Sequence, residues 1–206
     1  DIPQNTKYKF MKYLKQAGCA SCTMSIEGGN EFVRNRVMER SMPNEDIIFS
    51  HHRAWDLGIY TFSNVIFSVP VSLEDVAKYN LTRNSIDRDI ESVKLAMEAK
   101  VHFLECPQLF PYPGTKLGKY CVDNGFFDGD FSKLPQSYQN LSPLNCFTPE
   151  EKNMSQNLAL LAMWCVYFGS RKNALVRKVI SPIFFELTCK VLIRLPWSWC
   201  TKVYFV

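Results

Sequence analysis

The stretch "GCASCTMSIEGGN", residues 18–30, holds the first side chains whose types and spacing could do chemistry. Cys19 and Cys22 form a C-x-x-C pair, and such pairs ligate zinc or cycle between dithiol and disulfide in other proteins. A structural zinc site needs four ligands, and the sequence contains no second C-x-x-C pair. A strand is expected over 20–26, where positions three apart point to opposite faces. We therefore expect Cys19 and Cys22 to be packing residues.

Glu27 ends the same short apolar run and is followed by Gly28 and Gly29. In parallel α/β folds, ligands bind outside the carboxyl ends of the strands. A carboxylate there can accept two hydrogen bonds from a diol such as a ribose, and the glycines allow the backbone to turn close to a ligand. The alternative is a solvated loop carboxylate.

Two further polar residues lie where a ligand could reach them. Asn64 is inside the strand expected over 59–67, an unfavourable place for asparagine unless its amide has a partner. Arg40 ends the helix expected over 30–39, and its guanidinium could clamp a ligand carboxylate through two parallel hydrogen bonds. A surface arginine that complements the helix dipole is the alternative. The residues alone leave both alternatives open.

His51 and His52 stand next to each other in an expected helix. Adjacent helix positions do not face each other, so this pair is poorly placed to chelate one ion. His51 falls on the same side as Ile48 and Trp55, and we expect it to be a histidine packed in the core.

Strands and helices alternate over residues 8–106 in the order helix, strand, helix, helix, strand, helix, strand. The clearest helix, with Ser85 as its expected cap, carries Ile86, Ile90 and Val93 at helical spacing. Alternation of this kind predicts an α/β fold with a parallel sheet and right-handed crossovers. Roughly three strands are visible, so we expect part of a barrel or of a doubly wound sheet.

The remaining segments are less regular. Residues 68–84 contain Pro70 and several polar residues, and a loop is expected there. Thr148 begins a sequence typical of a helix start, and a helix is expected over 151–168. A further helical stretch is expected over about 172–195.

Composition, net charge and cysteine content narrow the classes of protein to which this chain can belong. The chain has 206 residues, of which 47 % are hydrophobic and 21 % charged, as in ordinary globular proteins. A net charge of +4 is too small to indicate a nucleic-acid partner, and none is expected. Eight cysteines at irregular spacing favour free, buried thiols over the disulfide framework of a secreted protein. No secretory leader is visible, so we expect a cytoplasmic protein.

The segment 171–206 combines basic and aromatic residues. It holds seven Lys or Arg and one acid, Glu186, with Phe, Trp and Tyr interleaved. A basic amphipathic stretch of this kind can lie on an anionic membrane surface, so peripheral membrane contact through 171–206 is one expectation. A helix that packs on the domain and exposes a solvated basic face is the other.

Three blocks of the sequence, in order, resemble the radical S-adenosylmethionine enzymes, above all the branch whose members often carry a cobalamin-binding domain. The blocks are "LKQAGCASCTMSIEGGNEFVRNRVMER", "LGIYTFSNVIFSVP" and "DRDIESVKLAMEAKVHFLECPQLFPYPGTKLGKYCVDNGFF". They span about residues 10–127, and "PYPGT" at 111–115 is the sharpest match.

The resemblance implies the C-terminal half of a partial (β/α)6 TIM-like barrel over residues 1–127, followed by a mostly helical C-terminal extension over 128–206. It implies S-adenosylmethionine as cofactor and also implies roles for three residues. Glu27 stands where family members place a strand-end Glu or Gln against S-adenosylmethionine. Asn64 stands where some relatives contact the ribose, and Arg40 where some bind the methionine carboxylate.

The C-x-x-x-C-x-x-C motif that holds the family's 4Fe–4S cluster is absent from the sequence. We therefore expect the C-terminal portion of a radical enzyme, inactive as an isolated chain and partnered by the missing N-terminal half of the barrel. The complete enzyme would act on an unknown small-molecule or lipid-like substrate, with cobalamin as an optional second cofactor. Ser68 and Val71 also replace the glycines of the family's "GlPgE" pattern.

A non-catalytic interpretation stays open beside the enzymatic one. The chain would then be an α/β binding or scaffold module that docks a partner or a membrane through its basic aromatic tail.

Overall fold

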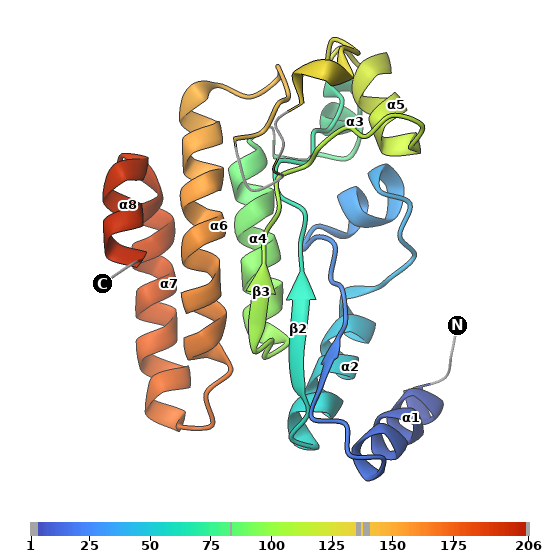
Figure 1. The fold of residues 1–206 in the computed structure, drawn as a ribbon, viewed down its shortest axis with the longest axis vertical. Helices are drawn as coiled ribbons and strands as arrows, with labels where there is room; N and C mark the ends of the chain where they lie inside the picture. The colour runs from blue at the N-terminus through green and yellow to red at the C-terminus, as the bar shows by residue number, and fades with distance from the viewer. Residues whose placement is uncertain (1–3, 83, 135–136, 138–140, 205–206) are drawn as a thin grey trace.

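The computed structural model of this protein describes residues 4–82, 84–134, 137 and 141–204. Its centre is a parallel sheet of three strands in the order β1 (Ser21–Thr23), β2 (Tyr60–Asn64) and β3 (Phe103–Glu105). Helices α2 and α4 lie behind the sheet, and α6, α7 and α8 stand beside β3 (Figure 1). The expected α/β class with parallel strands is confirmed. The described residues form an open sheet, and no barrel closes among them.

Each strand is preceded in the chain by a helix. Helix α1 (Gln4–Gln16) precedes β1, and α2 (Asn44–Asp56) precedes β2. Helix α4 (Ser85–Glu98) precedes β3 and buries Ile86 and Val93 in the main core, as its spacing predicts. A π-helical turn, Val33–Val37, follows the end of β1.

The expected cap at Ser85 is wrong, because the side chain of Asn84 accepts the hydrogen bond from the amide of Ile86 at 2.9 Å. The expected loop over 68–84 is also wrong in part, since it contains helix α3 (Leu73–Lys78). Ser72 caps α3 by accepting a hydrogen bond from the amide of Asp75 at 3.1 Å. Helix α3 is short and buries none of its residues, which explains why no apolar periodicity marks it.

The "PYPGT" sequence forms the turn that begins helix α5 (Lys116–Asp123). Thr115 is the N-cap, and its hydroxyl oxygen accepts a hydrogen bond from the amide of Gly118 at 3.0 Å. A Cβ at Gly118 would lie 2.2 Å from the carbonyl oxygen of Tyr112. The turn therefore requires glycine at position 118.

Helix α6 (Pro149–Gly169) begins where expected, with a capping box between Thr148 and Glu151. It lies along α4 and contributes Leu158, Leu161 and Cys165 to the main core. Helix α7 (Ser181–Lys190), preceded by the π-helical turn Val176–Ile180, and helix α8 (Trp197–Tyr204) complete the fold. Within the described ranges, no helix is long and apolar enough to cross a membrane.

His51 is a core residue, as expected, and only 2 % of it is exposed. Its Nδ1 lies 2.8 Å from the carbonyl oxygen of Ile47, and its Nε2 lies 2.9 Å from the hydroxyl of Ser63 on β2. Burial lowers the pKa of the imidazole. The histidine thus ties α2 to the central strand in its neutral form.

Candidate functional site

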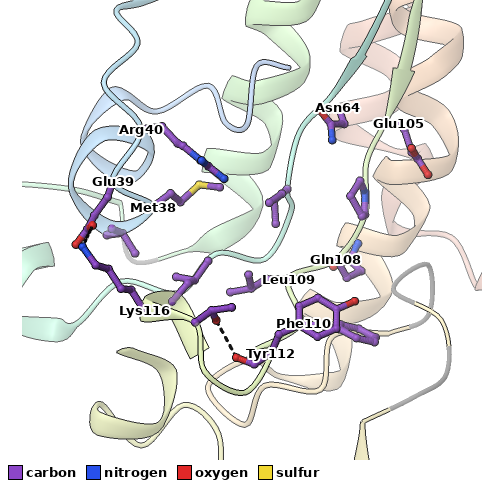
Figure 2. Close-up of a pocket in the computed structure, with 15 residues that line it drawn as sticks. Met38, Glu39, Arg40, Asn64, Glu105, Gln108, Leu109, Phe110, Tyr112 and Lys116 are labelled. Atoms are coloured by element: carbon purple, nitrogen blue, oxygen red, sulfur yellow. Dashed lines mark hydrogen bonds and ion pairs between the residues drawn. The ribbon is translucent and has the colours of Figure 1, made fainter. Parts of the chain in front are cut away.

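A pocket of about 540 Å³ opens at the carboxyl ends of β2 and β3. Its walls come from the segment 37–40 after β1, from the ends of β2 and β3, and from the start of α5. Figure 2 shows Arg40 reaching toward the pocket from one side, with Asn64 and Glu105 on the opposite side. Ligands of parallel α/β proteins bind at this edge of the sheet because successive strand ends meet there.

The structure brings Glu27, Arg40 and Asn64 together at this edge. Arg40 and Asn64 line the pocket, and Glu27 Oε1 lies 3.8 Å from Arg40 Nε. The side chain of Arg40 is 56 % exposed and that of Glu27 is 16 % exposed. The exposed guanidinium of Arg40 therefore lines the pocket, and the largely buried carboxylate of Glu27 lies beside it without lining the pocket itself.

The backbone of Glu27 is held firmly in an unusual conformation. Its φ is 65°, in the left-handed region that costs a non-glycine residue roughly 1 kcal/mol. Its amide donates to the carbonyl oxygen of Asn64 at 3.1 Å, and its own carbonyl accepts from the amide of Ile66 at 2.8 Å. These bonds to Asn64, the last residue of β2, and to Ile66 just beyond it enforce the conformation and fix the position of Cα, from which the carboxylate side chain extends.

Asn64 belongs to a polar row across the sheet. The hydroxyl of Ser25 donates to Asn64 Oδ1 at 2.5 Å, and Asn64 pairs in register with Glu105 of β3. This arrangement explains why asparagine is tolerated inside the strand. Glu105 is a pocket residue that the sequence patterns did not single out, although its position at the end of the third strand matches that of Asn64 in the second.

The charges around the pocket are of both signs. Lys116 Nζ at the start of α5 lies 2.5 Å from Glu39 Oε2, and this pair bridges the wall opposite the sheet. With Arg40 and Glu105 the lining holds two cations and two carboxylates. Ion pairs this exposed add little stability, so their side chains can be re-paired by a ligand that carries both charges.

The floor of the pocket is apolar. Ile66, Leu109 and Leu117 contribute aliphatic surface, and Phe110 and Tyr112 lie with ring centroids 6.3 Å apart. Ligand sites commonly combine such a surface with a few polar groups that fix orientation.

A buried polar network lies behind the pocket. The amide of Ser68 donates to Asp89 Oδ1 at 3.1 Å, and the hydroxyl of Ser155 lies 2.9 Å from Asp89 Oδ2. Burial raises the pKa of Asp89 to about 7, against the lowering effect of these hydrogen bonds and of Arg88. The carboxyl is therefore partly protonated near neutral pH.

Gln108 connects this network to the pocket. Its Oε1 accepts a hydrogen bond from the hydroxyl of Ser68 at 2.7 Å, whereas its Nε2 is buried and has no partner in the part of the chain that the structure describes. Gln108 also lines the pocket. Nothing in the sequence around "CPQLF" marks it, because its hydrogen-bond partners are Ser68, in the segment after β2, and Ser155 of α6.

Cys19 and Cys22 lie at the start of β1, away from this pocket. Burial raises the pKa of the Cys22 thiol, and the neighbouring Cys19 raises it further. A reactive cysteine has a lowered pKa instead, because the thiolate is the reactive form. No group of three or more metal-binding side chains exists among the described residues. These residues therefore do not fit a 4Fe–4S cluster.

Comparison of the chain with models of known protein families gave no match, and comparison with curated proteins gave none.

Proposed function

We propose that this pocket binds S-adenosylmethionine and that the chain is the C-terminal part of a radical S-adenosylmethionine enzyme. The observation that carries the proposal is the convergence of Glu27, Arg40 and Asn64 at one edge of a parallel sheet. The three residues belong to separate segments, and the sequence resemblance assigns each of them to this cofactor independently of their positions in space.

The chemistry of the site matches the ligand. S-adenosylmethionine carries a carboxylate, an ammonium group, a sulfonium, a ribose diol and a planar adenine. Arg40 suits the carboxylate through charge-assisted hydrogen bonds, and Glu27 and Asn64 suit the ammonium group and the ribose hydroxyls. Leu109 and Phe110 offer the adenine an apolar surface.

The chain's own residues bind and orient the cofactor in this proposal. A bound 4Fe–4S cluster would supply the electron that cleaves the sulfonium, and its thiolates would come from the N-terminal half of the barrel. The proposal needs no cobalamin.

The open face of the sheet supports the existence of such a partner half. Phe62 and Phe103 are paired across β2 and β3, and their rings stack with centroids 4.9 Å apart. Phe103 is nevertheless 43 % exposed. An aromatic ring exposed to this extent on a sheet face favours a covering layer of protein.

The test is calorimetric titration of the chain with S-adenosylmethionine, S-adenosylhomocysteine and adenosine. We expect S-adenosylmethionine to bind and Arg40→Met to weaken it about tenfold, the loss of one charge-assisted hydrogen bond. Arg36→Met is the matched control, because Arg36 is an exposed arginine of the nearby π-helical turn and does not line the pocket.

Failure of the unaltered chain to bind S-adenosylmethionine would overturn the proposal. Equal losses of affinity for S-adenosylmethionine in Arg40→Met and Arg36→Met would also count against it, because a general change of charge would then explain the effect.

A further inference from the structure

Helix α7 turns its aliphatic side chains outward, whereas Phe184 and Phe185 pack partly against the core. Exposed fractions are 62 % for Ile183, 45 % for Leu187 and 48 % for Val191, whereas Ser181 and Thr188 are buried against the molecule. A surface helix of a water-soluble protein normally shows the reverse distribution. We define the outer α7 face as the exposed aliphatic residues of this helix and its flanking turns: Leu175, Val179, Ile180, Ile183, Leu187 and Val191.

The contact between α6 and α7 includes small and polar groups beside the partly buried rings of Phe184 and Phe185. A Cβ at Gly169 would lie 3.5 Å from the hydroxyl of Ser181, and Cys165 Sγ lies 3.8 Å from the hydroxyl of Thr188. Helix pairs that face lipid pack in the same way, because the aliphatic residues are kept for the lipid side. Figure 1 shows α7 on the side of α6 away from the sheet, with α8 beside its upper end.

Aromatic side chains lie at and near the contact between α6 and α7. The ring of Phe184 meets that of Phe168 on α6 at a centroid distance of 5.3 Å, edge to face. Trp164 and Tyr167 lie next to Phe168, and each is 37 % exposed. Tryptophan and tyrosine with one side exposed are typical of the boundary between lipid and water.

The positive charge of the chain is concentrated on the same segment. Residues 171–206 contain seven Lys or Arg and one acid, although the whole chain has a net charge of only +4. The single acid, Glu186, lies 2.5 Å from Lys190 and is thereby neutralised. The exposed cations of this segment are Arg171, Lys172, Lys178 and Arg194, together with Lys190, which is paired with Glu186.

We propose that the outer α7 face docks on the surface of an anionic phospholipid bilayer. The helix lies parallel to the membrane plane, with Ile183 and Leu187 among the acyl chains and Lys178 and Arg194 at the phosphates. A bilayer surface suits both the basic residues and the exposed aliphatic residues of this segment. Its headgroups are negative, and its interior accepts aliphatic side chains without shape complementarity. The docking surface is separate from the S-adenosylmethionine pocket, so the two proposals can fail independently.

Vesicle co-sedimentation of the full chain tests the proposal. The probes are vesicles of phosphatidylcholine alone and vesicles in which about a third of the lipid is phosphatidylserine. We expect binding to the phosphatidylserine vesicles that decreases as salt is raised. The double variant I183S/L187S should weaken that binding at least tenfold, and K178E should weaken it several-fold.

Leu73→Ser on α3 is the matched control, because Leu73 is 63 % exposed, close to the value for Ile183, and lies outside the C-terminal helices. It should leave vesicle binding unchanged. Thermal unfolding followed by circular dichroism should be the same for all variants, since each replaces an exposed side chain.

Absence of binding to phosphatidylserine vesicles would overturn the proposal. Equal losses of vesicle binding in I183S/L187S and in Leu73→Ser would also overturn it. Concentration-dependent self-association in sedimentation velocity that I183S/L187S abolishes, without vesicle binding, would identify the face as a protein interface instead.

Discussion

The amide of Gly29 donates a hydrogen bond to the hydroxyl of Ser92 at 2.8 Å and joins the segment after β1 to helix α4. The same hydroxyl donates to the carbonyl oxygen of Arg88 at 3.0 Å. A Cβ at Gly29 would lie 2.4 Å from the backbone of Glu91 and Ser92. Close approach to a helix, rather than to a ligand, is what requires glycine at this position.

Gly29→Ala should therefore destabilise the protein by about 3 kcal/mol or more, because neither backbone can move away without breaking α4. Gly28→Ala is the matched comparison, since the nearest atom to a Cβ there is Met38 Sδ at 4.0 Å. It should change the free energy of unfolding by less than about 1 kcal/mol. Urea unfolding of both variants measures the difference, and equal effects would contradict the role assigned to Gly29.

Ser68 adopts a φ of 56° in the segment that follows β2, where the resembling family has glycine. Ser68→Gly relieves this strain, whereas Ser68→Ala keeps the strain, and both lose the hydroxyl that donates to Gln108. The glycine variant should therefore be about 1 kcal/mol more stable than the alanine variant. Parallel denaturant titrations give this difference directly, and an alanine variant of equal or greater stability would argue against a strained Ser68.

Asp89 should make the free energy of unfolding depend on pH. Burial raises its pKa from 3.8 to about 7 in the folded protein, so between these two pKa values the folded chain holds a proton that the unfolded chain has released. The stability that this proton provides is present at low pH and is lost as pH rises toward 7, at up to roughly 1.4 kcal/mol per pH unit.

Asp89→Asn mimics the protonated carboxyl and should remove this part of the pH dependence. The variant should gain stability relative to the unaltered protein at about pH 8 and differ less from it at about pH 5. Asp123→Asn on the surface of α5 is the control. Its difference from the unaltered protein in free energy of unfolding should be the same at about pH 8 and at about pH 5. Identical pH profiles with and without Asp89 would show that the carboxyl does not titrate in this range.

Thr115 caps helix α5 and lines the pocket. Thr115→Val keeps the shape but loses the oxygen that accepts from the amide of Gly118, and should cost about 1 kcal/mol. Thr115→Ser keeps that oxygen and should cost little. Thermal unfolding measures both, and a valine variant as stable as the serine variant would refute the capping role.

Much of the fold could be predicted from local patterns. The period of α4 and the capping signals at Thr148 predict their helices from sequence alone, because helix formation depends on neighbours three and four residues apart. Helices α3 and α5 carry weaker signals, since they are short and their capping residues act without an apolar stripe. The number and direction of the strands followed from the alternation of helices and strands.

The candidate site could be predicted only in part. Glu27, Arg40 and Asn64 were identifiable through the resemblance, but their proximity depends on the register between β1 and β2. Gln108 and Asp89 carry no local signal, because their significance lies in hydrogen bonds to Ser68 and Ser155, which are distant from them in the sequence.

Helix α7 shows most clearly which features the sequence determines and which depend on the tertiary structure. Its sequence alone specifies a helix with aliphatic residues on one side and Ser181 and Thr188 on the other. Periodicity, however, does not say which side meets α6 and which meets the surroundings. Only the tertiary packing, in which Gly169 and Cys165 of α6 present small contacts to Ser181 and Thr188, turns the aliphatic side outward.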